Sequence, residues 1–183
     1  MGQGSNLSRR TQCLGMGARE MRNWGARVRD GARVAGYGAL VVENSALRVT
    51  LLVDRGADVV EFLHKPTDTD FCTFSRRGLR GPAESAGRPF MDIYYGGWQE
   101  VFPSGGTPCT YAGAGFDQHA EVALLPWHPT ILEDSPDRVV VALEVRCLQT
   151  PFRLRRVLTL DAGTPRLEVE STDSPEKHWG GKG

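Results

Sequence analysis

Residues 91–129 concentrate side chains that can bind a small polar ligand. A flat aromatic ring packs against the C–H face of a sugar ring, while amides, carboxylates and imidazoles hydrogen bond to its hydroxyl groups. Both kinds of side chain occur here beside paired glycines, a mixture that strand packing alone seldom requires. The stretch therefore predicts a small-molecule site. The candidate binding residues are Trp98, Gln99, Glu100, His119 and Glu121.

The spacing of these residues predicts which of them share a face. If residues 116–124 are extended, His119 and Glu121 point to the same side of a strand and could bind adjacent hydroxyl groups. Trp98 and Glu100 are likewise two positions apart. A structural interpretation of both pairs stays open, because a His and a Glu on one strand often form a surface pair, and Trp98 could be a core residue beside a Glu100 that binds loop backbone.

Composition and charge limit the classes of function. A chain of 183 residues is long enough for one domain with one sizeable core. Its formal net charge is zero, so the chain as a whole lacks the field that concentrates nucleic acid or anionic lipid. No apolar run reaches the length of a membrane helix. We therefore expect neither a nucleic-acid partner nor a membrane partner, and the oligomeric state stays open.

The cysteines argue against a zinc site or a redox motif, because they form no CxxC pair and have no nearby His at ligand spacing. Free thiols in a reducing cytosol fit this pattern, and a disulfide between strands that folding brings together stays open. The sequence thus indicates a cytoplasmic protein without a bound metal. The four cysteines are Cys13, Cys72, Cys109 and Cys147.

The amino-terminal residues are strongly basic. Residues 1–35 contain seven arginines against Glu20 and Asp30, an excess of five positive charges. No continuous apolar segment follows Arg9 and Arg10, so a secretory signal is not indicated. We expect residues 1–20 to form a disordered basic extension. An arm that binds nucleic acid is the open alternative for this extension, since Trp24 is the only aromatic residue interleaved with the arginines.

Apolar residues alternate with polar ones in the first half of the chain, which predicts antiparallel strands. Three such strands span residues 39–43, 47–53 and 59–64 and form a meander. A short strand at 71–74 is expected to follow. Residues 75–89 are rich in Gly, Arg and Pro and predict a long surface loop.

The alternation returns in the second half. It predicts strands at 139–148, 152–160 and 167–169, with Arg156 interrupting the apolar face of the middle one. No stretch of ten or more residues has the 3.6-residue period of a helix. The sequence therefore predicts an all-β fold, an antiparallel β-sandwich.

The alternation ends near residue 170, so residues 171–183 are expected to be an irregular tail. A sheet that stops there would leave an edge with unpaired backbone groups, which natural proteins normally cover. We therefore expect the chain to be a fragment or a truncated product with an incomplete sandwich.

Seven motifs between residues 21 and 170 occur together in the order of a known family. In chain order, they are RNWG, ALVVENSALRVTLLVDRGADVVEFLHKPTDTDF, GGWQEVFPSGG, QHAEV, LLPW, TPFRLRRVLTL and PRLEVE. This region resembles the amino-terminal half of aldose 1-epimerase-like proteins of the galactose mutarotase superfamily. The resemblance implies a mutarotase-type supersandwich that binds a monosaccharide or a sugar derivative in an open cleft.

The resemblance also implies a chemistry. Active members interconvert the α and β anomers of aldoses without a cofactor: an acid protonates the ring oxygen and a base removes the anomeric hydroxyl proton. His119 aligns with a family histidine that holds the sugar near its ring oxygen, but Ala120 replaces the glycine that usually follows it. The family's general acid and base lie in its carboxy-terminal half, and His178 does not match that motif. The catalytic residues therefore stay unassigned.

Three hypotheses about function follow. The first is a carbohydrate-binding protein related to aldose 1-epimerases, whose epimerase activity depends on the other half of the family's fold. The second is a non-catalytic sugar-binding or sensing module. The third is a truncated product without an independent function.

Overall fold

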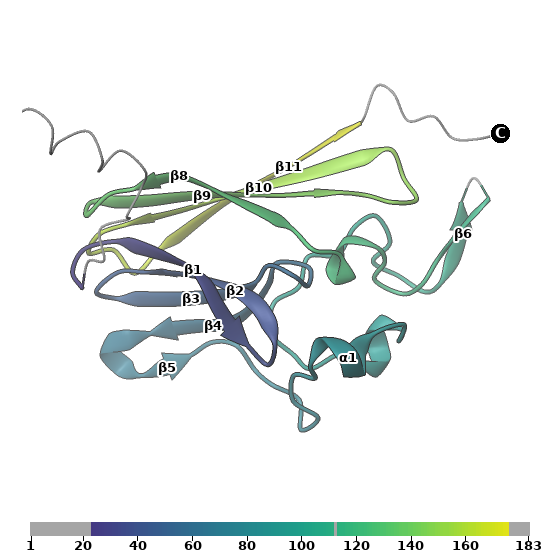
Figure 1. Ribbon diagram of the computed structural model, residues 1–183, viewed down its shortest axis with the longest axis horizontal. Helices are drawn as coiled ribbons and strands as arrows, with labels where there is room; N and C mark the ends of the chain where they lie inside the picture. Colours follow the sequence, from purple (N-terminus) through teal and green to yellow (C-terminus); the bar gives the residue numbers. More distant parts are fainter. Residues whose placement is uncertain (1–22, 112, 176–183) are drawn as a thin grey trace, which may run out of the picture.

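The computed structural model describes residues 23–111 and 113–175, and these residues form an antiparallel β-sandwich (Figure 1). The all-β sandwich that the alternation predicts is confirmed. The first sheet has five strands in chain order: β1 (Arg27–Val34), β2 (Tyr37–Glu43), β3 (Leu47–Leu52), β4 (Asp58–His64) and β5 (Thr69–Asp70). The second has four strands in the order β11 (Leu167–Pro175), β10 (Phe152–Asp161), β9 (Arg138–Arg146) and β8 (His128–Asp134).

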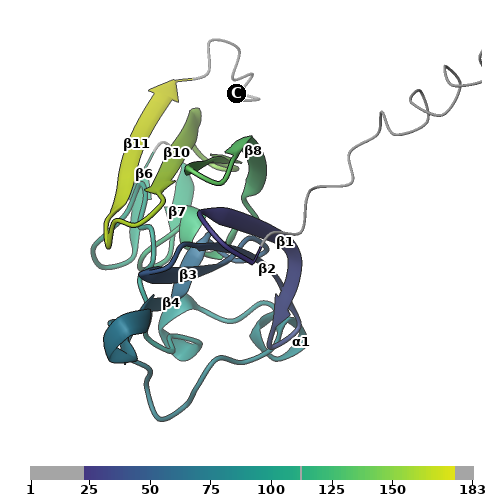
Figure 2. The ribbon, with the colours of Figure 1, turned by 90° about the vertical axis from the view of Figure 1, so that its left-hand side faces the viewer.

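A long connection joins the two sheets and lies toward one end of the sandwich (Figures 1 and 2). It contains a short helix and a two-stranded hairpin, and the 3-10 turns mark its sharp bends. Its elements are α1 (Pro82–Ser85), η2 (Phe90–Asp92), β6 (Cys109–Tyr111), β7 (Ala114–Phe116) and η3 (Val122–Leu124), while η1 (Lys65–Thr67) links β4 to β5. The predicted binding residues all belong to this connection.

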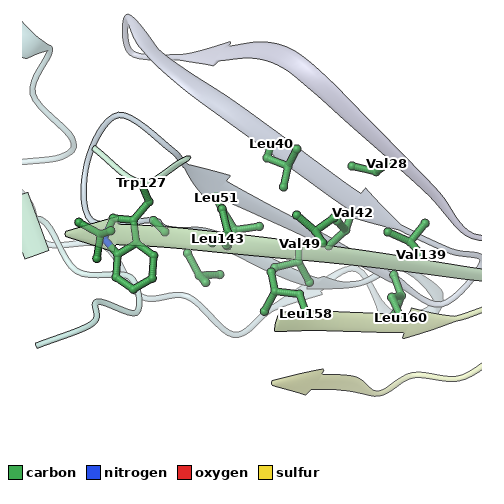
Figure 3. Packing of buried hydrophobic residues seen from close by; sticks show 14 of the residues in the cluster. Val28, Leu40, Val42, Val49, Leu51, Trp127, Val139, Leu143, Leu158 and Leu160 are labelled. Carbon is green, nitrogen blue, oxygen red and sulfur yellow. The ribbon is translucent and has the colours of Figure 1, made fainter. Parts of the chain in front are cut away.

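The main core lies between the two sheets (Figure 3). Strand alternation produces it, because every second side chain of a strand points to the same face. On β10, for example, Leu154, Leu158 and Leu160 are buried while Arg153 and Arg155 are exposed. The residues labelled in Figure 3 are Val28, Leu40, Val42, Val49, Leu51, Trp127, Val139, Leu143, Leu158 and Leu160.

The turn between β2 and β3 connects the two sheets. The Asn44 side-chain amide donates hydrogen bonds to the carbonyl oxygens of Asp161 (2.7 Å) and Thr164 (2.8 Å) in the turn after β10. Its Oδ1 accepts from the backbone N–H groups of Ala46 (2.8 Å) and Leu47 (2.7 Å). All the hydrogen-bonding groups of this buried amide are thus used, half within its own turn and half across to the other sheet.

Two strand predictions need correction. The short strand expected at 71–74 is instead β5 at Thr69–Asp70, and Phe74 makes only an isolated bridge to Gly96. The irregular tail expected from residue 171 is wrong for residues 171–175, which continue β11 and pair with β10. Their polar side chains hide the strand from a pattern based on hydrophobicity. The predicted basic extension, residues 1–20, and residues 176–183 lie outside the described residues.

Candidate functional site

Two glycines let the segment that carries Trp98 lie directly against β4. Trp98 and Val59 exchange both backbone hydrogen bonds, at 2.9 and 3.0 Å. Gly96 has φ +106°, and a Cβ at this position would lie 1.9 Å from the carbonyl oxygen of Thr73. Gly97 has φ +76°. Only glycine adopts this backbone course without strain, which explains the Gly pair before Trp98.

A cleft of about 300 Å³ lies beside this segment. It brings together two of the predicted binding residues, Gln99 and His119. The Gln99 side chain is held by a hydrogen bond from its Nε2 to the carbonyl oxygen of Gly96. Aromatic rings form another part of the wall: the imidazole of His119 meets the Phe90 ring edge to face at 5.1 Å, and Phe90 lies 5.8 Å from Tyr94. The lining residues are Phe90, Met91, Tyr94, Gln99, Val101 and His119.

The backbone around His119 is a turn, so residues 116–124 are not one extended segment and the condition for His119 and Glu121 to share a face is not met. β7 ends at Phe116, and η3 begins at Val122. His119 itself has φ +61°. Its Nδ1 is buried and has no hydrogen-bond partner among the described residues. The other ring nitrogen, Nε2, lies 3.5 Å from Gln118 Nε2. The turn separates His119 from the direction of the Glu121 side chain.

Glu121 holds a loop of the second sheet instead of lining the cleft. Its Oε2 accepts hydrogen bonds from the backbone N–H groups of Leu148 (2.7 Å) and Gln149 (3.0 Å), and its Oε1 accepts from the hydroxyl of Thr150 (3.0 Å). The residue is buried. Its carboxylate is therefore committed to the connection between β9 and β10.

Trp98 and Glu100 contact a buried arginine that the sequence marked only as an interruption of an apolar face. The guanidinium of Arg156 lies 5.9 Å from the ring centre of Trp98 and 5.3 Å from that of Trp127. Its Nη2 forms an ion pair with Glu100 Oε2. Burial lowers the pKa of Arg156. The sequence feature that could have revealed this cluster is Arg156 itself, a single charged residue on the apolar face of the strand predicted at 152–160.

A second buried polar cluster lies beneath the same segment. Asp58 is fully buried and accepts hydrogen bonds from Tyr95 Oη (2.8 Å) and Arg55 Nε (3.3 Å). Arg55 also donates to the carbonyl oxygen of Ile93 (3.2 Å). Burial raises the pKa of Asp58 to about 7, although Tyr95 and Arg55 favour its charged form. The sequence prediction missed this cluster, because Arg55 and Asp58 lie between the strands predicted at 47–53 and 59–64.

The other sequence predictions concern metals, thiols and membranes. Within residues 23–111 and 113–175, no group of three or more His, Cys, Asp or Glu side chains could hold a metal ion. Cys72 and Cys109 are free thiols, and Cys147 is buried. No helix of this part of the chain is long and apolar enough to cross a membrane.

Comparison with known proteins gives the chain no family: no protein-family description matches it, and no curated protein sequence matches it. The similarity to aldose 1-epimerases therefore stays a prediction from the sequence motifs.

Proposed function

We propose that this protein binds a monosaccharide or a sugar derivative in the cleft formed by Gln99 and His119. The observation that carries the proposal is that these two residues, chosen from the sequence for sugar chemistry, line one cleft with Phe90 and Tyr94. Its volume, about 300 Å³, suits a small ligand. The aromatic rings supply apolar surface for a sugar ring, and the amide and imidazole supply hydrogen-bonding groups for its hydroxyls.

The chemistry of the cleft favours binding over catalysis by these residues alone. Anomer exchange needs both an acid and a base at the sugar. His119 can serve as one of them, but the lining residues include no carboxylate. Glu100 is paired with Arg156, and Glu121 is bonded to the loop after β9. We therefore propose a sugar-binding protein related to aldose 1-epimerases, with the described residues acting as a binding module.

The test is a titration of the full chain with glucose, galactose and their 6-phosphates, followed by thermal unfolding and by NMR. A ligand that binds only the folded state raises the unfolding temperature as its concentration exceeds the Kd. His119→Asn removes the imidazole and tolerates the positive φ, and Gln99→Ala removes the amide. Each variant is expected to weaken sugar binding about tenfold, since a lost hydrogen bond of about 1.4 kcal/mol has this effect.

His128→Asn is the matched control, because His128 is an exposed histidine of β8 and does not line the cleft. It should leave sugar binding unchanged. The proposal is wrong if none of these sugars changes either the unfolding temperature or the spectrum. Acceleration of anomer exchange that His119→Asn abolishes would replace the binding module by an isomerase.

A further inference from the structure

Arg156 occupies a position where the fold would ordinarily place an apolar side chain. It lies on the inward face of β10 between Leu154 and Leu158, and only 1% of its surface is exposed. Burying a guanidinium removes its hydration, so the site must return that free energy through charge pairing or aromatic contacts. Neither its Nε nor its Nη2 makes a hydrogen bond among the described residues, so Glu100 compensates the charge as an ion pair.

Three side chains contact the guanidinium of Arg156, and the charge of Asp58 also favours its charged form. Glu100 supplies the opposite charge and Trp98 supplies one aromatic face, while Trp127 lies against the guanidinium as a second aromatic face. Cations over indole rings are attracted by the negative ring face, and most strongly where water is excluded. Trp127 is buried in the core, whereas Trp98 is 43% exposed. Arg156 therefore attaches an exposed tryptophan and a partly exposed glutamate to the interior.

These two residues flank Gln99, which lines the cleft. On its other side, the same segment is bonded to Val59 of β4. Residues 98–100 are thus held by the first sheet through the backbone of Trp98 and by the second sheet through Arg156. These two attachments fix the residues on either side of Gln99, so they set the direction of its side chain together with its own hydrogen bond to Gly96.

We propose that Arg156 is a positioning residue that fixes segment 98–100 between the two sheets and so orients Gln99 in the cleft. Its effect on sugar binding rests on the proposed function. Its effect on the order of segment 98–100 does not, and this allows the two proposals to fail separately.

The test compares Arg156→Met with Arg155→Met in the full chain. Methionine fills similar volume without charge, and replacing a buried ionic group by an apolar one is often neutral or stabilising. Glu100 keeps access to water, because 27% of its side chain is exposed. We expect Arg156→Met to unfold near the wild-type temperature. Hydrogen exchange at the Trp98 amide should become at least tenfold faster while the Val141 amide of β9 is unchanged, and sugar affinity should fall about tenfold.

Arg155→Met is the matched control, because Arg155 is the adjacent residue of the same strand but is exposed and pairs with Glu144 (3.1 Å). It should change neither measurement. Arg156→Lys keeps the charge but lacks the planar group that meets two indoles, so it should restore part of the Trp98 protection. Glu100→Gln weakens the same ion pair without a substitution in the core, so it should also speed hydrogen exchange at the Trp98 amide. This variant provides the test if Arg156→Met does not fold.

Three results separate the interpretations. Unchanged Trp98 exchange in Arg156→Met, or in Glu100→Gln if the former does not fold, overturns the positioning role whether or not a sugar binds. Faster exchange at Trp98 and Val141 alike shows a general loss of stability and also overturns it. Selective loss of Trp98 protection in a protein that binds no sugar supports the role of Arg156 and contradicts the proposed function alone.

Discussion

At the scale of residues, two buried carboxylates differ in how their charge is compensated. Burial alone raises the pKa of both Glu43 and Asp58. Glu43 receives hydrogen bonds from Lys65 and Arg27, which outweigh burial and lower its pKa to about 2. Asp58 has Arg55 as its hydrogen-bonded cation, and its Oδ1 has no hydrogen-bond partner among the described residues. The hydrogen bonds that cationic side chains donate therefore decide whether the pKa of a buried carboxyl group is raised or lowered.

Asp58 should make stability fall as the pH rises. Its folded pKa is about 7, whereas an aspartate in an unfolded chain titrates near 4. Between about pH 4 and pH 7 the folded state holds more protons, so the contribution is full below about pH 4 and is lost toward pH 7. Asp58→Asn cannot ionise, so its free energy of unfolding relative to wild type should rise by up to about 1.4 kcal/mol per pH unit across this window.

Urea unfolding at pH 5, 6, 7 and 8 measures this effect. The informative quantity is how the difference in free energy of unfolding between Asp58→Asn and wild type changes with pH. Its absolute size also contains the changed attraction between residue 58 and Arg55. Asp117→Asn removes an exposed carboxyl and should follow the wild-type curve. Parallel curves for Asp58→Asn and wild type would contradict a raised pKa for Asp58.

The residues of the candidate cleft were predictable by type but not by direction. Trp98 and Glu100 do belong to one cluster, as their spacing suggested, but a buried arginine gathers them and the cleft receives Gln99. His119 and Glu121 diverge because the chain turns between β7 and η3. The hydrogen bond from the Ala120 N–H to the Asp117 carbonyl oxygen closes this turn. An aspartate favours turns, but a single one does not locate a turn in the sequence.

At the scale of elements, the interior strands were predictable, whereas the edge strands β1, β5 and β8 were not and the edge strand β11 was predicted only in part. β3 and β10 alternate apolar and polar residues because one face of each meets the core, and β2, β4 and β9 carry longer apolar runs. β1 and β8 lie at sheet edges, carry many charged or polar residues, and contain register shifts. Such irregular edges discourage pairing with other chains, but the same features remove the period that would reveal the strands.

Glu121 should stabilise the loop between β9 and β10. Glu121→Gln replaces one acceptor oxygen by an NH₂ group that faces donors, so at least one hydrogen bond from Leu148, Gln149 or Thr150 is lost. Because bonds to a buried charged acceptor are strong, we expect a loss of about 2–4 kcal/mol in the free energy of unfolding. Urea unfolding and the amide exchange rates of Leu148 and Gln149 measure this loss.

Glu144→Gln is the control, since the Glu144 side chain on β9 is 41% exposed and its partners Arg153 and Arg155 are exposed. It should change stability by about 0.5 kcal/mol or less. If Glu121→Gln kept full stability but lost sugar binding, Glu121 would be a ligand residue and its structural assignment would be wrong.

At the scale of the whole molecule, the sandwich depends on polar contacts as well as on its core. The apolar faces of the two sheets supply most of the driving force, but such contacts are not directional. The bonds from Asn44 to the turn after β10 are directional and fix how one sheet lies on the other. Arg156 performs a similar role beside the cleft, because it joins β10 to the segment bonded to β4.

Asn44→Asp separates the contact between sheets from the local turn. The carboxylate still accepts the bonds from Ala46 and Leu47 but cannot donate to Asp161 and Thr164, and it faces their carbonyl oxygens instead. Two lost bonds and this repulsion should lower the free energy of unfolding by about 3 kcal/mol or more at pH 7. The deficit should shrink near pH 3, where a protonated carboxyl can donate one bond.

Asn23→Asp makes the same chemical change at an exposed position and should have little effect. Urea unfolding monitored by circular dichroism and fluorescence measures both variants, and equal stability of the two at pH 7 would show that the Asn44 contact does not hold the sheets together.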